Sequence, residues 1–207
     1  MDELNSPQEC ALVLVDPQAG LGFAVQSMDR QQLLNNLVAL VETARTFDVP
    51  TILSTSATKV YSGPPFPAIR ELLPDVPVYD RRSMNLWEDD AARQAVIATG
   101  RKKLLFAGML TEACVCFPVL CCLAEGYQAF VVADACGGAT VDSHHYALDR
   151  MRSKGAEVTS WLQVLLEFQR DWTRKETYDR ARGLVERFGG GYGMGLKYAR
   201  DMLVKPT

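Results

Sequence analysis

Short apolar runs alternate with longer segments of helical periodicity along this chain, and this alternation restricts the fold more than any other feature. The first run, residues 11–15, is apolar at every position and ends at Asp16 and Pro17, as expected for a central strand covered on both faces. Residues 33–44 then carry apolar side chains at helical spacing. Strands that alternate with helices indicate an α/β protein with a parallel sheet.

The same pattern continues to about residue 172, so we expect one domain over residues 1–172. Residues 173–207 become strongly charged, then glycine-rich, then amphipathic. We expect them to form a helical appendage that packs on the domain or on a neighbouring subunit. The predicted strands are 11–15, 51–55, 76–79, 104–107, 129–133 and 157–161, and the predicted helices are 33–44, 87–99, 114–125, 143–154 and 162–172.

Composition excludes several classes of protein. An apolar content of 48% over 207 residues supports a substantial core. A net charge of −3 without a long basic run argues against a nucleic-acid partner. The longest apolar stretch, 114–124, is about half the ~20 residues that a membrane span requires, so we expect no membrane partner. The acidic, polar amino terminus predicts no signal peptide and therefore a cytoplasmic protein.

Cys114 is the candidate nucleophile. It follows the apolar run 104–107 at a predicted strand-to-helix junction. A helix that begins near Cys114 would direct its free N–H groups at the sulfur, and thiol pKa values are lowered in such positions. The alternative interpretation is a buried structural thiol, since free cysteines are among the most buried residues. We expect the other five cysteines to be inert: Cys10, Cys116, Cys121, Cys122 and Cys136.

We expect no metal site and no cofactor. The two histidines, His144 and His145, are adjacent in sequence and far from any cluster of cysteines. A zinc site needs three or four convergent ligands, which this pattern does not predict.

A carboxylate is expected beside Cys114. Ligands of open parallel sheets bind at the carboxyl ends of the strands, where the strand order reverses. If the first and fourth strands are adjacent, Asp16 and Cys114 meet there, and Asp16 can accept the thiol proton. Asp16 could instead cap a turn before Pro17, and Asp134 after the fifth strand is an alternative carboxylate.

A positive charge is expected near this pair. Arg81 and Arg82 follow the third predicted strand, and Lys59 follows the second. Adjacent arginines are by default a solvated turn. Their position after a strand nevertheless allows one of them to reach the carboxylate.

Three motifs together resemble the isochorismatase-like cysteine hydrolases. They are Val-Asp-Pro-Gln-Ala-Gly at 15–20, Met-Asn-Leu-Trp at 84–87, and Gly-Met-Leu-Thr-Glu-Ala-Cys-Val at 108–115. Further residues resemble the YcaC-like subgroup of that family: 147–151, 155–156, Trp161 and 170–172. The resemblance runs from about residue 10 to the carboxyl end of the chain.

The resemblance implies a doubly wound, Rossmann-like three-layer fold with a mostly parallel six-stranded sheet in the order 3-2-1-4-5-6. It also implies an Asp-Lys-Cys triad, in which Asp16 and Cys114 match two members. Arg81, or alternatively Arg82, stands where the family has lysine. The family further implies a cis peptide between Leu110 and Thr111, and backbone N–H groups of Ala113 and Cys114 as an oxyanion hole.

We therefore expect a cysteine hydrolase that cleaves a small amide or related C–N bond through an acyl-enzyme on Cys114. Arginine keeps its charge, so it can stabilise an anion but is a poor proton donor. Proton transfer then falls to Asp16 or water. We expect a small-molecule substrate and a pocket lined by Gln18, Phe23, Asn85 and Trp87.

Three rival interpretations remain. Nicotinamidase chemistry usually needs a metal bound by an aspartate and two histidines, which the matching region lacks. Vinyl-ether hydrolysis of the isochorismatase type does not need the cysteine. A non-catalytic scaffold or binding protein could keep the fold without turnover. The subgroup implies a homo-oligomer, which the apolar tail residues could serve: Tyr192, Met194, Leu196, Tyr198, Met202 and Leu203.

Overall fold

The computed structural model describes residues 4–203. Its strands form a six-stranded sheet in the order β3-β2-β1-β4-β5-β6, with parallel pairing between all neighbours. This confirms the doubly wound α/β fold and its strand order. The strands are β1 (Cys10–Val15), β2 (Thr51–Ser56), β3 (Val78–Arg81), β4 (Lys103–Met109), β5 (Gln128–Gly137) and β6 (Glu157–Thr159).

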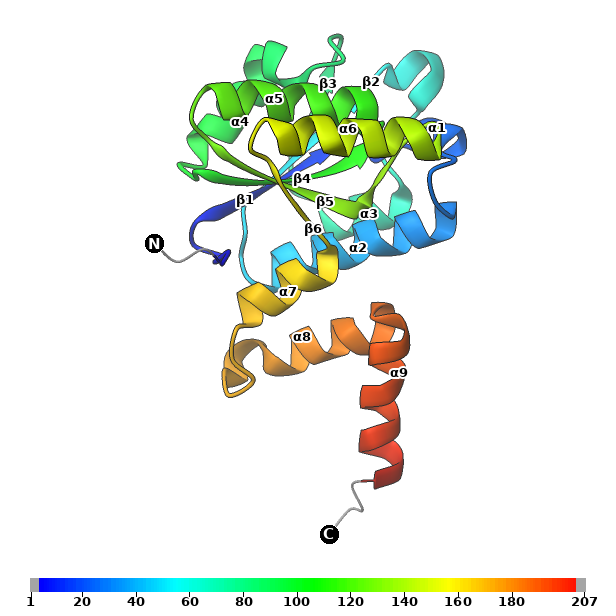
Figure 1. Ribbon diagram of the computed structural model, residues 1–207, viewed down its shortest axis with the longest axis vertical. Coiled ribbons are helices and arrows are strands. Elements are labelled where there is room, and N and C mark those ends of the chain that lie inside the picture. The colour runs from blue at the N-terminus through cyan, green and yellow to red at the C-terminus, as the bar shows by residue number, and fades with distance from the viewer. Residues whose placement is uncertain (1–3, 204–207) are drawn as a thin grey trace.

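Helices cover both faces of the sheet (Figure 1). One face carries α2, α3 and α7, and the other carries α4, α5 and α6. The helices are α1 (Ala19–Ala24), α2 (Arg30–Thr46), α3 (Pro67–Leu72), α4 (Asp90–Ala98), α5 (Cys116–Ala124), α6 (Val141–Ser153), α7 (Trp161–Gln169), α8 (Lys175–Phe188) and α9 (Gly190–Tyr198).

The position of β1 between two helical layers explains why residues 11–15 are all apolar. Every residue of β1 is buried. Leu12 and Leu14 face one apolar cluster, while Val13 and Val15 face the other. Because successive side chains of a strand point to opposite faces, a strand between two helical layers must be apolar throughout.

Several element boundaries differ from the predicted ones. The predicted helix 87–99 begins only at Asp90, because Asp89 caps it by accepting the Ala92 N–H at 2.9 Å. β5 continues past Asp134 to Gly137, with a register irregularity against β4 between Phe106 and Gly108. Short helices α1 and α3 were not predicted; each has six residues, which is too few to show helical periodicity.

The carboxyl-terminal helix α8 packs against α2 and α7, and α9 extends away from the sheet (Figure 1). Ala181, Leu184 and Val185 of α8 join the apolar cluster beneath the sheet. The boundary at residue 172 between a domain and an appendage stays a prediction. Residues 1–3 of the predicted domain and residues 204–207 of the predicted appendage lie outside the described residues. Within residues 4–203, no helix has the length and apolar character needed to cross a membrane.

Gly108 allows β4 to pass close to β1 directly before the cysteine motif. Its φ is +130°, and a Cβ atom there would lie 1.7 Å from the Val15 carbonyl oxygen. Backbone atoms cannot be displaced cheaply, and residues with side chains rarely adopt this φ. Glycine is therefore required where the two central strands approach the site.

We expect Gly108→Ala to lower the free energy of unfolding by at least about 2 kcal/mol, because both the backbone strain and the clash act at this position. The matched control is Gly183→Ala in α8, where a new Cβ meets nothing within 4 Å. Helix propensity should make that control neutral or more stable by up to about 1 kcal/mol. Urea unfolding of both variants measures the difference, and equal stabilities would contradict this account.

Candidate active site

Asp16 lies directly after β1 and is fully buried. Its Oδ2 accepts hydrogen bonds from Arg81 Nη2 at 2.5 Å and from Ser56 Oγ at 2.9 Å. Its Oδ1 accepts from Ser54 Oγ at 3.4 Å. The residue has φ +50°, a left-handed conformation that aspartate tolerates better than most residues. The carboxylate is thus held by partners from both β2 and β3.

Arg81, and not Arg82, forms the ion pair with Asp16. Both charged side chains are 0% exposed. Arg81 also donates through Nη1 to the Ser83 carbonyl oxygen, whereas Arg82 is exposed. In the sheet Arg81 lies opposite Ser56, and the small serine lets the long arginine cross the end of β2 to reach Asp16.

Cys114 lies on a π-helical turn, Thr111–Val115, between β4 and α5. It is buried, with 8% of its surface exposed. The structure has a non-proline cis peptide between Met109 and Leu110, so the predicted position between Leu110 and Thr111 was wrong by one residue. β4 continues to Met109 and the turn starts at Thr111, which puts the cis bond at the end of the strand.

The predicted lowering of the Cys114 pKa was wrong. α5 begins at Cys116, so the sulfur lies before the helix, inside the turn. Burial and the negative charge of Asp16 raise the pKa of Cys114, and Arg81 opposes this only in part through its charge and a hydrogen bond. The thiol is therefore protonated at rest.

Burial also raises the pKa of Asp16, and the charge of Arg81 and hydrogen bonds from Ser56, Cys114 and Arg81 oppose the shift. Asp16 and Arg81 are thus both near enough to Cys114 to shift its pKa. A carboxylate whose pKa is raised is a better proton acceptor. The arrangement suits transfer of the thiol proton to Asp16 as a substrate is attacked.

Of the predicted oxyanion-hole groups, the Ala113 N–H is engaged within the turn. It donates to the Leu110 carbonyl oxygen at 3.2 Å, and the Val115 N–H donates to the same oxygen at 3.2 Å. Ala113 could bind an oxyanion only by giving up this bond. The role of the Cys114 N–H stays a prediction.

A cavity of about 750 Å³ leads to Cys114. Leu21, Val60, Met84 and Leu110 form much of its apolar wall, and Arg81 and Cys114 belong to its lining. Cavities of this size accommodate small molecules. The nucleophile candidate is therefore reachable by a ligand although it is largely buried.

Gln18 was predicted to contact substrate, but it supports the loop that follows β2 instead. Its Oε1 accepts the Ser56 N–H at 2.9 Å, and its Nε2 donates to the Ser56 carbonyl at 3.1 Å and to the Gly63 carbonyl. Gln18 is fully buried and does not line the cavity. A glutamine side chain has both hydrogen-bond donors and an acceptor, so it can bond to backbone N–H and carbonyl groups inside a loop.

Phe23, Asn85 and Trp87 do not line the cavity either. Phe23 is 75% exposed on α1. Asn85 is buried, and its side chain accepts the Trp87 N–H at 3.1 Å to start the turn Leu86–Glu88. Trp87 packs edge-on against Tyr127, with ring centroids 5.5 Å apart. Sequence proximity to the motifs did not predict which side chains face the cavity.

Asp134, the alternative carboxylate, has a structural contact of its own. Its Oδ1 accepts the Trp161 N–H at 2.9 Å and so holds the start of α7. Asp134 is not among the residues that line the cavity. The structure therefore brings Asp16, and not Asp134, to Cys114.

Contacts that were not predicted from the sequence hold the cysteine turn against α6. Thr111 Oγ1 lies 2.8 Å from His144 Nδ1. Glu112 Oε1 accepts from the Ala139 N–H at 3.0 Å and from Ser143 Oγ at 3.2 Å. These partners are about thirty residues away in sequence, and only the packing of α6 brings them close. Ser54 and Ser56 could have been found, because the predicted sheet places the end of β2 beside Asp16.

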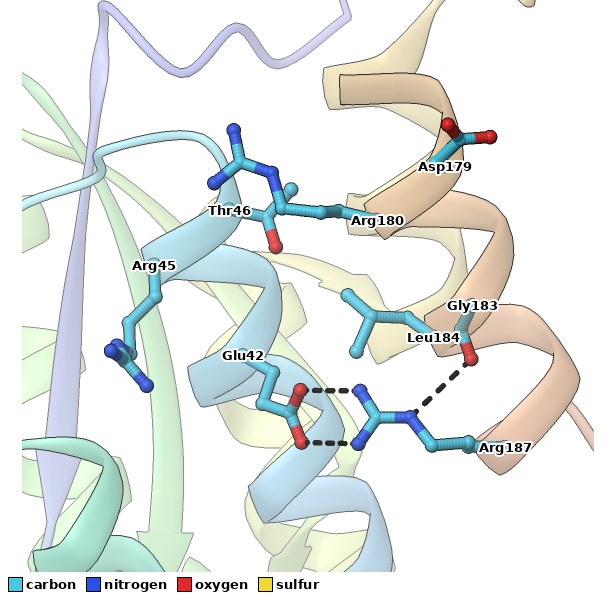
Figure 2. Close-up of a pocket in the computed structure, with 8 residues that line it drawn as sticks. All are labelled: Glu42, Arg45, Thr46, Asp179, Arg180, Gly183, Leu184 and Arg187. Carbon is cyan, nitrogen blue, oxygen red and sulfur yellow. Dashed lines mark hydrogen bonds and ion pairs between the residues drawn. The ribbon is translucent and has the colours of Figure 1, made fainter. Parts of the chain in front are cut away.

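A second hollow lies between α2 and α8 (Figure 2). A two-point ion pair between Glu42 and Arg187, at 3.1 and 2.5 Å, crosses it. Its lining is mostly charged and contains no cysteine, serine or histidine. Within residues 4–203, no group of three or more histidine, cysteine, aspartate or glutamate side chains is arranged to hold a metal ion.

Comparison with known proteins agrees with this geometry. The model of the isochorismatase domain matches residues 10–163. This chain belongs to the isochorismatase family. The match spans the whole sheet, from β1 to β6, and includes Asp16, Arg81 and Cys114.

Within the isochorismatase family the chain is YcaC-like, as its sequence resemblance predicted. It is 40% identical over 165 residues to the protein named Probable hydrolase YcaC of Escherichia coli strain K12, covering 79% of each chain. The crystal structure of the YcaC gene product from E. coli, described as an octameric hydrolase of unknown specificity, superposes with a TM-score of 0.93 at 36% identity over 99% of both chains.

A second YcaC structure, from Pseudomonas aeruginosa with hexane-2,5-diol and covalent acrylamide, has a TM-score of 0.91 at 33% identity. It covers 95% of this chain and 97% of that one. These comparisons support a hydrolase of the isochorismatase family.

The electrostatics of the site predict how Cys114 alkylation by iodoacetamide depends on pH. The midpoint should lie above that of an ordinary thiol, because burial and Asp16 disfavour the thiolate. Asp16→Asn removes the neighbouring negative charge and should move the midpoint down. Arg81→Gln removes the positive charge and should move it up. Peptide mass mapping at a series of pH values follows Cys114 separately from the other cysteines.

The matched control is Arg93→Gln, which removes an arginine from an exposed ion pair with Glu125 and should leave the midpoint unchanged. An Asp16→Asn midpoint equal to or above that of the unaltered protein would contradict the assigned electrostatics.

Proposed function

We propose that this isochorismatase-family protein is a cysteine-dependent hydrolase of a small amide or related C–N bond. The observation that carries the proposal is the buried Asp16–Arg81 ion pair within reach of Cys114, at the end of a cavity. A nucleophile, a base and a fixed positive charge in one desolvated place are the groups that acyl transfer needs.

In the first half-reaction the Cys114 sulfur bonds to the carbonyl carbon while its proton passes to Asp16. The carbonyl oxygen becomes an oxyanion. When the tetrahedral intermediate collapses, the C–N bond breaks and the leaving nitrogen takes the proton from Asp16. The amine departs and a thioester to Cys114 remains.

In the second half-reaction a water molecule attacks the thioester, and Asp16 accepts one of its protons. Collapse breaks the C–S bond, the carboxylic acid departs, and the sulfur regains a proton from Asp16. The site returns to its starting state, so Asp16 acts as base and acid in turn.

Arg81 supplies charge and does not transfer protons, because a guanidinium stays protonated at any workable pH. Its positive charge opposes the effect of burial on both Asp16 and Cys114. It therefore limits the cost of forming a thiolate at the moment of attack. A lysine in this place could also have moved a proton.

The YcaC relatives support two further parts of the proposal. One is described as octameric, and we propose that this chain is also a homo-oligomer. Another is described with covalent acrylamide, a small amide whose alkene reacts with nucleophiles, which supports a small-molecule substrate. A cytoplasmic location and the absence of nucleic-acid and membrane partners stay predictions.

We expect ammonia release from a panel of small primary amides to depend on the three site residues. Cys114→Ala and Asp16→Asn should each lower kcat/KM at least roughly a thousandfold, because nucleophile and base act as one unit. Arg81→Lys should retain more activity than Arg81→Gln, because it keeps the charge. Circular dichroism and urea unfolding establish that the variants are folded.

Turnover that survives Cys114→Ala would contradict the acyl-enzyme and favour chemistry that does not need the thiol. A folded protein that turns over no amide while Cys114 is accessible would favour the scaffold interpretation.

A further inference from the structure

Two exposed cations, Lys59 and Arg82, line the cavity. Lys59 lies on the turn Thr58–Ser62 after β2, and Arg82 directly follows β3. Both are exposed and both line the cavity that ends at Cys114. Neither side chain makes a hydrogen bond or an ion pair with the residues that the structure describes.

The neighbouring Asp80 does not neutralise both of them. Its Oδ1 accepts hydrogen bonds from Thr55 Oγ1 at 3.0 Å and from Thr58 Oγ1 at 2.6 Å. Those hydrogen bonds, with the charge of Lys59, hold the pKa of Asp80 below its usual value, so Asp80 is ionised. Deeper in, Arg81 is matched by Asp16. One net positive charge therefore remains on the cavity lining.

Apolar side chains form much of the remaining lining, from Leu21, Val60 and Met84 to Leu110 beside the cysteine turn. A ligand that reaches Cys114 therefore contacts apolar side chains and lies near a net positive charge. Exposed lysines and arginines are usually only solvated. These two differ because they line the same cavity as the nucleophile.

We propose that the preferred substrates are small amides that carry a carboxylate at the end away from the scissile C–N bond. This inference rests on the proposed function, since it assumes that the amide carbonyl is placed at Cys114. Lys59 and Arg82 bind the carboxylate, and the guanidinium of Arg82 offers it two parallel N–H groups. The apolar wall contacts the short carbon chain between the two ends.

The charge of the lining favours a carboxylate over a more highly charged anion. One net positive charge matches a monoanion. A dianionic phosphate would leave negative charge uncompensated beside Asp80, where like charges repel. The lining also attracts monoanions from solution, so both binding and encounter should depend on ionic strength.

The test uses two maleimides that differ in charge and by one methyl group, and it does not need turnover. 3-Maleimidopropionate and its methyl ester each add the Cys114 sulfur to an alkene carbon, while the thiol proton ends on the neighbouring carbon. Peptide mass mapping gives the rate at which each maleimide labels Cys114. The ratio of the acid's rate to the ester's rate in the folded protein is divided by the same ratio for Cys114 in urea. This quotient is the carboxylate preference of the folded site.

We expect a carboxylate preference of roughly tenfold at low ionic strength. Lys59→Gln and Arg82→Gln should each reduce it about threefold, and the double variant should bring it to one or below, because Asp80 then leaves the lining negative. Added salt should also reduce the carboxylate preference. The matched control is Lys154→Gln, which removes an exposed lysine after α6 and should leave the preference unchanged.

A preference at or below one, or one that survives in the double variant, would overturn the inference and leave the proposed function standing. If neither maleimide labels Cys114 in the folded protein while both label it in urea, the cavity does not admit small molecules to the thiol. That result would overturn the proposed function and this inference with it.

Discussion

The buried ion pair between Asp16 and Arg81 is the interaction on which the rest of the site depends. Moving two charges out of water costs several kcal/mol for each ion, and their attraction offsets this only when the geometry is good and other hydrogen bonds complete it. Here two serine hydroxyls and the Ser83 carbonyl supply such hydrogen bonds, whereas the buried Nε of Arg81 has no partner among the described residues. The ends of β1, β2 and β3 are thereby fixed to one another, beside the turn that carries Cys114.

This pair also decides how Cys114 can act. A cysteine beside a carboxylate in a buried place is a weak acid, and the raised pKa of Cys114 follows from burial and from Asp16. A thiolate poised at rest is therefore not the working state. We propose instead that attack is coupled to proton transfer, with Asp16 as the proton carrier and Arg81 as a constant charge. We propose that Lys59 and Arg82, further out, act on binding and not on this chemistry.

Much of the fold and the centre of the site could be predicted from the sequence. The uninterrupted apolar run 11–15 required a central strand, and adjacency of β1 and β4 then brought Asp16 to Cys114. Local boundaries were harder, because Asp89 capping and the turn before α5 depend on hydrogen bonds that periodicity does not show. The lining was mispredicted for the same reason: Gln18 and Asn85 satisfy backbone groups nearby, and sequence alone cannot separate that from contact with substrate. The choice of Arg81 over Arg82 needed the register that places Ser56 opposite Arg81.

The central claim is that Cys114 forms a covalent acyl intermediate, and acid quenching during turnover tests it most directly. A rapidly quenched reaction with an amide substrate, followed by intact-protein and peptide mass spectrometry, should show one acyl group per chain, located on Cys114. The group should be absent in Cys114→Ala and should disappear when substrate is exhausted. Steady turnover with no acyl group on Cys114, or with the group on another residue, would contradict the account.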